Sequence, residues 1–217
     1  MEDDSRVWDA GLVLDGLLEA ALERWGIEGE ARARLHRYAE MLSRQLRVRR
    51  LSGARDAAEI VAHVEEGLAA AELGRALAGS GTWVDVGSGG GLPGLVVAAT
   101  WPGRVVLVEP RGRRADFLEL ASLRMGVEVE VLRGRLEPRG WVGEAEGLAE
   151  QEIAVASARA VFAPEEWLAR VRNMRNIEWC SVHTRPGWTP GPAWVSGGWR
   201  EVSAWRVEFV RRDPAAT

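Results

Sequence analysis

Residues 83 to 94 read Trp-Val-Asp-Val-Gly-Ser-Gly-Gly-Gly-Leu-Pro-Gly, and this stretch decides the fold. An apolar run carrying Asp85 leads into glycines at alternate positions, Gly87, Gly89 and Gly91, and an apolar segment begins at Leu92. Glycine permits sharp turns and close approach of a ligand, and a following helix would present free N–H groups with partial positive charge. The stretch therefore predicts a strand, a ligand-binding loop and a helix.

Short runs of β-branched and apolar residues recur after this loop. They predict strands over 82–86, 105–108, 127–132 and 153–156, with a helix over 112–125. Strands alternating with helices are typical of a parallel sheet covered on both faces. Farther on, a stretch rich in proline, glycine and tryptophan predicts irregular structure, and the alternation from Arg200 to Val210 predicts one sheet-edge strand.

The first third of the chain predicts helices only. Apolar residues recur at helical spacing from Leu14 to Trp25 and from Leu35 to Leu46. Asp56, with Glu59 three residues later, resembles a capping box that opens a third helix. We therefore expect a helical extension over residues 1–75 and one sheet domain over residues 76–217.

Composition excludes several kinds of chemistry. All 28 basic residues are arginine, so neither a phosphate-loop lysine nor a Schiff-base lysine is available. The single cysteine, Cys180, lies in an apolar run and is interpreted as a core residue. The three histidines are far apart and show no paired metal-ligand spacing, so we expect no metal site.

Two arginine clusters leave a local contact with RNA open, although the net charge of −4 argues against a protein that coats nucleic acid. Arginine forks suit phosphate, but a solvated helix end followed by a loop gives the same pattern. The sequence does not choose between these interpretations. The first cluster is Arg44, Arg47, Arg49, Arg50 and Arg55, and the second is Arg111, Arg113 and Arg114.

Hydropathy along the chain bears on the compartment. No stretch approaches the roughly 20 uninterrupted apolar residues that span a bilayer. The N-terminal residues lack the basic and then apolar pattern of a signal peptide. We therefore expect a cytoplasmic protein without membrane contact, and we expect it to be a monomer.

Carboxylates at the predicted strand ends indicate what the glycine loop binds. Asp85 ends the first strand and could serve an amino group, and Glu109 follows the second strand and can accept both ribose hydroxyls of an adenosine. Residues 135–137 follow the third strand and could frame the adenine. Open α/β sheets bind ligands at the carboxyl ends of their strands, so these positions favour S-adenosylmethionine.

A nicotinamide-dependent oxidoreductase stays open as an alternative. Residues 89–94 also fit the G-x-G-x-x-G pattern, and Glu109 falls about 20 residues farther on, as that fingerprint expects. Methyl transfer is favoured by Asp85 two residues ahead of Gly87, by the helical lead-in, and by the lack of a separate substrate domain.

Residues 85–94 resemble the signature of the bacterial ribosomal RNA small-subunit methyltransferase G family, also called glucose-inhibited division protein B. Leu-Pro-Gly after the glycines is distinctive among methyltransferases. Further stretches resemble the family in the same order, and together they cover roughly residues 10 to 170. They are residues 50–63, 108–114, 134–137 and 157–160.

The resemblance implies a Rossmann-like class I methyltransferase fold, α/β, with a mostly parallel seven-stranded sheet flanked by helices. It implies S-adenosylmethionine as cofactor and N7 methylation of one guanine in small-subunit ribosomal RNA, free or in the 30S particle. Guanine N7 carries a lone pair, so no catalytic base is expected. The family's cofactor-binding positions match Gly87, Leu92, Leu136, Glu137 and Arg159, and the whole expected set adds Asp85, Ser88, Gly89, Gly91 and Glu109.

The C-terminal part departs from the family pattern. Residues 184–187 read Thr-Arg-Pro-Gly where members usually carry Lys-Gly, and Arg175-Asn176 replaces a pair of glycines. Ala62 stands where an arginine is expected before His63. Because these positions would hold the substrate, two alternatives stay open: a methyltransferase with another substrate, and a binding module without catalysis.

Overall fold

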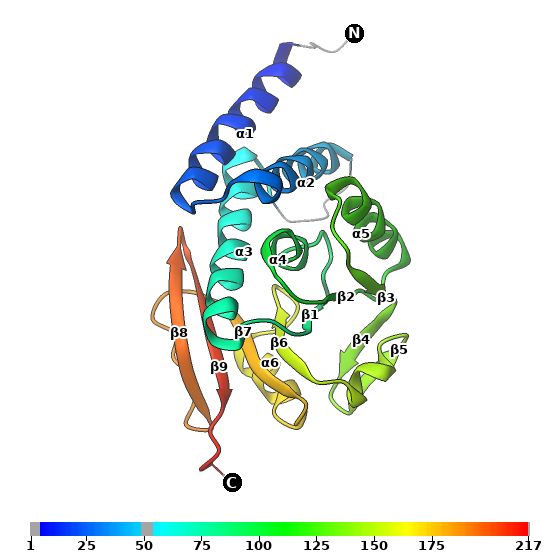
Figure 1. Ribbon diagram of the computed structural model, residues 1–217, viewed down its shortest axis with the longest axis vertical. Coiled ribbons are helices and arrows are strands. Elements are labelled where there is room, and N and C mark those ends of the chain that lie inside the picture. The colour runs from blue at the N-terminus through cyan, green and yellow to red at the C-terminus, as the bar shows by residue number, and fades with distance from the viewer. Residues whose placement is uncertain (1–4, 49–53, 217) are drawn as a thin grey trace.

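The computed structural model describes residues 5–48 and 54–216, with side chains over 11–44 and 54–216. Three helices precede a sheet that has helices on both faces (Figure 1). The helices are α1 (Ser5–Arg24), α2 (Gly29–Val48), α3 (Ala57–Ala78), α4 (Gly94–Thr100), α5 (Gly112–Met125), α6 (Pro164–Val171) and the short 3-10 helix η1 (Glu146–Glu150). The strands are β1 (Trp83–Val86), β2 (Val105–Val108), β3 (Glu130–Leu132), β4 (Gly134–Glu137), β5 (Gly140–Gly143), β6 (Ile153–Ala158), β7 (Ile177–Thr184), β8 (Trp194–Val202) and β9 (Trp205–Arg212).

The main sheet has seven strands in the order β3-β2-β1-β6-β7-β9-β8. The first five are parallel, and at one end β9 pairs antiparallel with both β7 and β8. The predicted α/β fold with a mostly parallel seven-stranded sheet is therefore confirmed. The carboxyl ends of β1, β2, β6 and β7 meet at one edge, which is where such sheets bind ligands.

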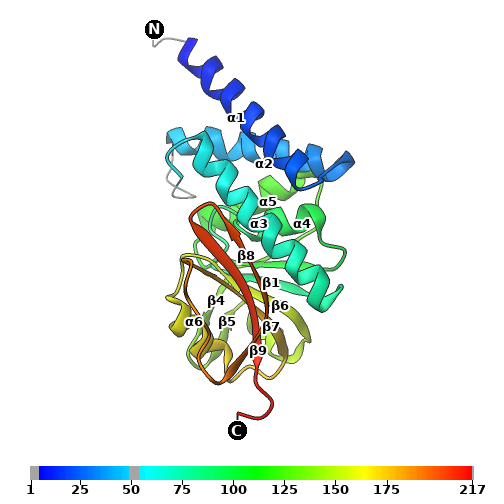
Figure 2. The same ribbon diagram turned by 90° about the vertical axis from the view of Figure 1, so that its left-hand side faces the viewer.

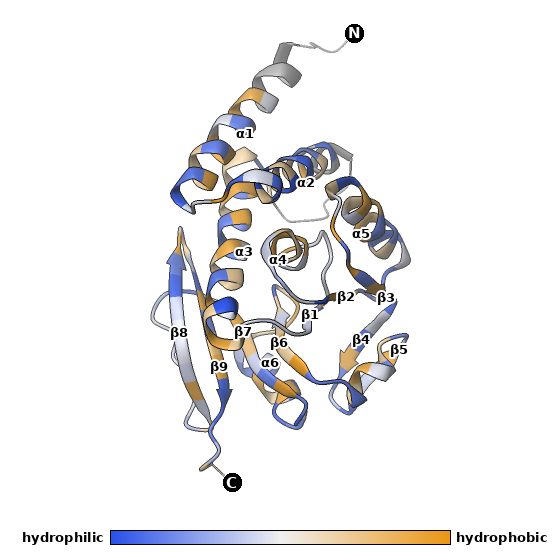
Figure 3. Cartoon of the chain, in the orientation of Figure 1, coloured by the Kyte–Doolittle hydropathy of each residue, from blue (hydrophilic) through white to orange (hydrophobic). Residues whose placement is uncertain are grey.

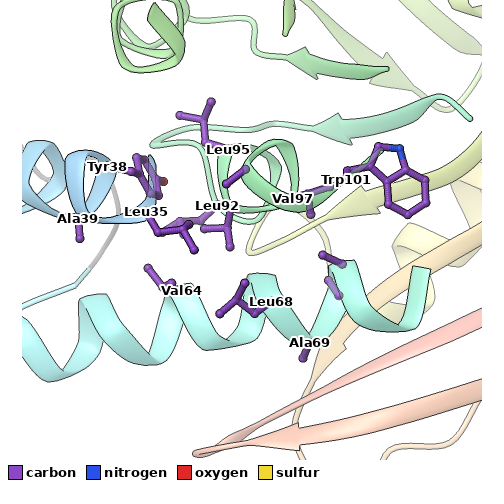
Figure 4. Packing of buried hydrophobic residues seen from close by; sticks show 14 of the residues in the cluster. Leu35, Tyr38, Ala39, Val64, Leu68, Ala69, Leu92, Leu95, Val97 and Trp101 are labelled. Atoms are coloured by element: carbon purple, nitrogen blue, oxygen red, sulfur yellow. The ribbon is translucent and has the colours of Figure 1, made fainter. Parts of the chain in front are cut away.

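Two hydrophobic cores cover the two faces of the sheet. Trp83 in β1 faces α3 and α4, where its ring packs edge-on against Trp101 and Phe209. Its neighbour Val84 faces the other core, with Trp141 and Trp167. Figure 4 shows how α2, α3 and α4 interdigitate through leucine and valine side chains in the first core. Side chains on successive residues of a strand point to opposite faces, so both faces are buried.

The three predicted N-terminal helices are confirmed. The Asp56 carboxylate accepts a hydrogen bond from the Glu59 N–H at 2.9 Å, as the capping prediction requires. The N-terminal half of α1 projects from the body (Figures 1 and 2). Helix α3 continues across the predicted boundary between residues 75 and 76 and packs on α4, β8 and β9. The division into a helical extension and a sheet domain stays a prediction. Within the described residues, no helix combines the length and the apolar character that crossing a bilayer takes.

The C-terminal strand prediction is wrong in its bounds and its position. Residues 200–210 belong to two strands, β8 and β9, joined by a turn in which Ser203 has a φ of 54°. Ser203-Ala204 contains neither glycine nor asparagine, so the alternating pattern continues through it. The edge strand is β8, whose mixed hydropathy is visible in Figure 3, and β9 lies inside the sheet.

Two other features differ from the sequence prediction. The third strand begins at Glu130 instead of Val127, because residues 127–129 form no ladder with β2. The separate hairpin of β4 and β5 was not predicted, since its four-residue strands are too short to show a period. This hairpin carries residues 135–137 to the ligand edge of the sheet.

Candidate functional site

A cavity of about 540 Å³ lies at the carboxyl edge of the sheet. This volume is typical of sites for small molecules. Its wall is formed by the ends of β1 and β2, the start of α5, the β4–β5 hairpin, the loop after β6, and α6. The lining residues are Val86, Gly87, Glu109, Pro110, Arg111, Arg114, Arg135, Leu136, Glu137, Pro138, Ala160, Val161, Phe162 and Arg170.

Part of the predicted cofactor set lies in this wall. Gly87, Glu109, Leu136 and Glu137 line the cavity, although Leu136 and Glu137 belong to a separate hairpin, distant in sequence from the glycine loop. The remaining predicted residues do not line the cavity. They are Asp85, Ser88, Gly89, Gly91, Leu92 and Arg159.

Glu109 connects the glycine loop to the start of α5. Its Oε2 accepts a hydrogen bond from the Gly89 N–H, and its Oε1 accepts one from the Arg111 N–H, each at 2.9 Å. The residue is 2% exposed. A carboxylate has about four lone-pair sites, so two bonds leave capacity for ribose hydroxyls.

The backbone of the glycine loop has a conformation that disfavours residues with a Cβ atom. Gly87 has a φ of +70°, and a Cβ there would lie 2.5 Å from Val161 Cγ2. The Tyr38 hydroxyl donates to the Gly90 carbonyl at 2.7 Å, and the Ser88 hydroxyl donates to the Asp85 carbonyl at 2.9 Å. The loop is therefore fixed by the surrounding structure before any ligand arrives.

Asp85 lies beneath the loop and is 1% exposed. Its Oδ1 accepts a hydrogen bond from the Ser157 hydroxyl at 2.7 Å, and that hydroxyl accepts one from Trp83 Nε1 at 2.9 Å. Among the described residues, no hydrogen bond of good geometry is made to Asp85 Oδ2, although the Gly94 N–H lies near enough to the carboxylate to lower its pKa. Burial raises the pKa of Asp85, against the opposing hydrogen bond from Ser157. One buried carboxylate oxygen is thus left without a hydrogen bond of good geometry, directly behind the loop.

Arg159 makes its contacts on the side of α3, away from the cavity. Its Nε donates to Glu66 Oε2 at 2.7 Å, and its Nη2 lies 2.6 Å from His63 Nδ1. Glu66 Oε1 lies 2.7 Å from His183 Nδ1, and both of these side chains are 1% exposed. This network ties α3 to the ends of β6 and β7, and sequence reasoning missed it.

The pKa values of two residues in this network, Glu66 and His63, are lowered. Burial alone would raise the pKa of Glu66, but hydrogen bonds and charges from His183 and Arg159 outweigh it and lower the pKa to about 2. Burial, together with the charge of Arg159, lowers the pKa of His63 to about 4. The available sequence signal was Glu66 on the otherwise apolar buried face of α3, three residues after His63. A glutamate in that position is almost never buried without a partner.

Cys180 lies in the second hydrophobic core, as predicted. Burial raises the pKa of its thiol to about 12, so the thiolate needed for nucleophilic chemistry is not formed. In the first arginine cluster, Arg44 pairs with Glu40 and Arg55 with Glu59. The side chain of Arg47, and Arg49 and Arg50 entirely, lie outside the described residues.

The family model described as rRNA small subunit methyltransferase G matches residues 31–177, which is more than half of the chain. The chain belongs to the rRNA small subunit methyltransferase G family. The matched region runs from α2 to the start of β7, so it contains the glycine loop, Glu109 and the β4–β5 hairpin. Strands β8 and β9 lie beyond it, in the part where the sequence departs from the family.

Curated relatives carry the name Ribosomal RNA small subunit methyltransferase G. The protein from Salinispora arenicola is 48% identical over 109 residues, which cover 49% of this chain and 40% of the relative. The protein from Salinispora tropica is 42% identical over 154 residues, covering 69% of this chain and 58% of the relative. The chain thus spans about half of the length of the curated relatives it matches.

Solved structures of the same fold extend the comparison to the whole sheet. A mutant of MtNAS in complex with S-adenosylmethionine superposes with a TM-score of 0.50 and 18% identity, over 92% of this chain and 73% of that one. At this level of identity the likeness establishes the fold, and function is argued from the site.

Proposed function

We propose that this chain is an S-adenosylmethionine-dependent methyltransferase that methylates N7 of a guanine in small-subunit ribosomal RNA. Membership of the family supports this proposal. The observation that carries it is the cavity in which Gly87 and the buried carboxylate of Glu109 meet at the carboxyl edge of the sheet. Either free ribosomal RNA or the 30S particle is proposed as the partner.

The residues of the cavity fit the proposed cofactor. Glu109 has acceptor capacity for the two ribose hydroxyls, and Leu136 offers an apolar wall for the adenine. Asp85 Oδ2, buried without a hydrogen bond of good geometry, suits the ammonium group of the amino-acid end. When bound, the cofactor supplies an electrophilic methyl group on a sulfonium. A protein of the same fold has been solved with this molecule, which is consistent with the proposal.

The chain's own residues would act by binding, orienting and excluding water. The N7 atom of guanine has a free lone pair, so its attack on a methyl group requires no residue to remove a proton. The fixed glycine loop positions one reactant, and Val161 and Phe162 cover the loop side of the cavity. Alignment of two reactants in a site closed to water is sufficient to account for catalysis of this kind.

Transfer of tritium from labelled cofactor to ribosomal RNA tests the proposal. The RNA comes from a strain that lacks the modification and is offered both free and in 30S particles. After digestion to nucleosides, the label is expected in 7-methylguanosine. Label in another nucleoside would refute the assignment to guanine N7. No label in either RNA, with the cofactor still bound, would identify a binding module without catalysis.

Thermal unfolding separates the proposed cofactor from the nicotinamide alternative. A ligand that binds only the native state raises its melting temperature by mass action. S-adenosylhomocysteine is expected to raise the melting temperature, and NAD is expected to leave it unchanged. Protection by NAD alone would overturn the proposal.

A further inference from the structure

Three arginine side chains lie unpaired at the start of α5 in the part of the chain that the structure describes. Elsewhere, arginines such as Arg24 and Arg133 pair with carboxylates. Among the described side chains, those of Arg111, Arg113 and Arg114 make no hydrogen bond, ion pair or ring contact. Two acids lie near them along the chain. Glu109 is buried, and both of its oxygens already accept backbone N–H groups, while Asp116 pairs with Arg133.

The position of these arginines opposes the stability of the helix. The N-terminus of an α-helix carries partial positive charge and favours acidic residues. The first turn of α5 contains no acidic residue, and Arg111 at the N-cap forms no side-chain cap. Three positive charges therefore lie together at a positive helix end. Uncompensated charge of this kind is typical of a binding site whose ligand supplies the opposite charge.

Two of the three arginines face the candidate cofactor cavity. Arg111 and Arg114, three positions apart, both line it. The other arginines of the wall, Arg135 and Arg170, already pair with Glu137 and Glu166. The adenosine part of the cofactor carries no negative group, and the cofactor's one carboxylate is at its amino-acid end, which we place beside Gly87. An adenosine bound beside Glu109 therefore gives these two guanidinium groups no counter-charge.

We propose that Arg111 and Arg114 bind phosphate groups of the RNA substrate at the mouth of the cavity. The inference rests on the proposed function. Guanidinium forks match phosphate oxygens in geometry and charge. A polyanion approaching a chain of net charge −4 needs a local positive surface, and these two residues provide it beside the reacting atoms. The buried Glu109 carboxylate argues against a nucleotide 2′-phosphate as the ligand, because it would repel that group.

The test measures RNA affinity for the double variant Arg111→Gln/Arg114→Gln. Fluorescence anisotropy follows a labelled fragment of small-subunit ribosomal RNA, and an unrelated single strand of equal length, over a series of salt concentrations. Arg124→Gln is the matched control, because Arg124 is exposed and lies at the other end of α5. The double variant Arg111→Lys/Arg114→Lys keeps both charges.

The glutamine double variant is expected to bind both RNAs about tenfold or more weakly at low salt. The slope of log affinity against log salt should fall by about 1.4, which is about 0.7 for each lost phosphate contact on a single strand. Its melting temperature and its affinity for S-adenosylhomocysteine should not decrease. The Arg124 control should bind like the wild type, and the lysine variant should keep most of the salt slope.

Four outcomes would overturn the inference. If the wild type binds and methylates RNA and the glutamine variant binds it equally well, the arginines are not phosphate contacts, although the proposed function survives. If the variant loses cofactor affinity but not RNA affinity, the arginines serve the cofactor. If NADP protects the wild type but not the variant, they bind a dinucleotide phosphate. A wild type without affinity for RNA would remove the proposed RNA substrate together with this inference.

Discussion

Arg159 donates from Nε to Glu66 Oε2 at 2.7 Å, and this contact joins the loop after β6 to the middle of α3. Glu66 also holds His183 from β7, so one buried carboxylate connects three elements at the ligand edge of the sheet. Removing one partner of a buried ion pair leaves the other buried without compensation. The network therefore holds α3 against the ends of β6 and β7.

Replacing Glu66 tests the strength of this connection. Glu66→Gln should lower the free energy of unfolding by about 3–5 kcal/mol, because Arg159 would stay buried without its counter-charge. Urea unfolding followed by circular dichroism measures the change. Glu72→Gln is the control on the same helix, because Glu72 pairs with Arg200 at an exposed position, where about 1 kcal/mol or less is expected. Equal losses in the two variants would show that Glu66 is not a special anchor.

The stability of the fold at acid pH should depend on the titration of His63 and Glu66. The folded pKa of His63, about 4, lies below its unfolded value of 6.5, so the unfolded chain takes up the proton first and stability falls between pH 6.5 and 4. The folded pKa of Glu66, about 2, lies below 4.5, so its contribution is complete above pH 4.5 and is lost toward pH 2.

His63→Gln separates these two windows. Melting temperatures measured from pH 7 to pH 3 should show a smaller decrease between pH 6.5 and 4 in the variant than in the wild type. The decrease below pH 4.5 should persist, because Glu66 is still present. A wild type with constant stability from pH 7 to pH 4 would contradict the assignment to His63.

Much of the fold could be predicted because its local signals agree with one another. The period of apolar residues locates α2 and α5, and the glycines after Asp85 mark the turn from strand to helix. The C-terminal hairpin could not be predicted in the same way. Its turn at Ser203 carries a positive φ without glycine or asparagine, so no local residue marks the place where β8 ends.

The candidate site could be predicted where backbone position alone decides it. Gly87 and Glu109 lie at strand ends, and the topology of the sheet brings them to one edge. The orientation of Arg159 could not be predicted, because it depends on Glu66, 93 positions earlier in the chain. Contacts between distant residues, fixed by packing, decide such side chains, and a sequence period does not report them.

Asp85→Asn should separate binding from stability. The substitution removes a buried charge, and with it the desolvation that raises the pKa of Asp85. Its melting temperature should therefore stay the same or rise. Affinity for S-adenosylhomocysteine should fall by about 1.5–3 kcal/mol if Oδ2 accepts a hydrogen bond from the ammonium group. Isothermal titration calorimetry measures this change. An unchanged affinity would show that Asp85 does not contact the ligand.

Gly87→Ala should weaken both the fold and the site. The new Cβ would lie 2.5 Å from Val161 Cγ2 in a backbone conformation of positive φ. Such a change should cost more than about 1 kcal/mol of stability and displace the wall of the cavity. The double variant Gly87→Ala/Val161→Ala relieves the clash and should recover part of the melting temperature. Full cofactor affinity in Gly87→Ala would argue against a close approach of ligand to this backbone.

A crystal structure of the chain with S-adenosylhomocysteine would show whether the cavity at the carboxyl edge of the sheet binds the cofactor. The ribose hydroxyls are expected within hydrogen-bond distance of Glu109, the adenine against Leu136, and the amino-acid end beside Gly87. Binding of the nucleoside elsewhere would refute the assignment of this site. An empty cavity, together with an affinity that Glu109→Ala leaves unchanged, would refute it as well.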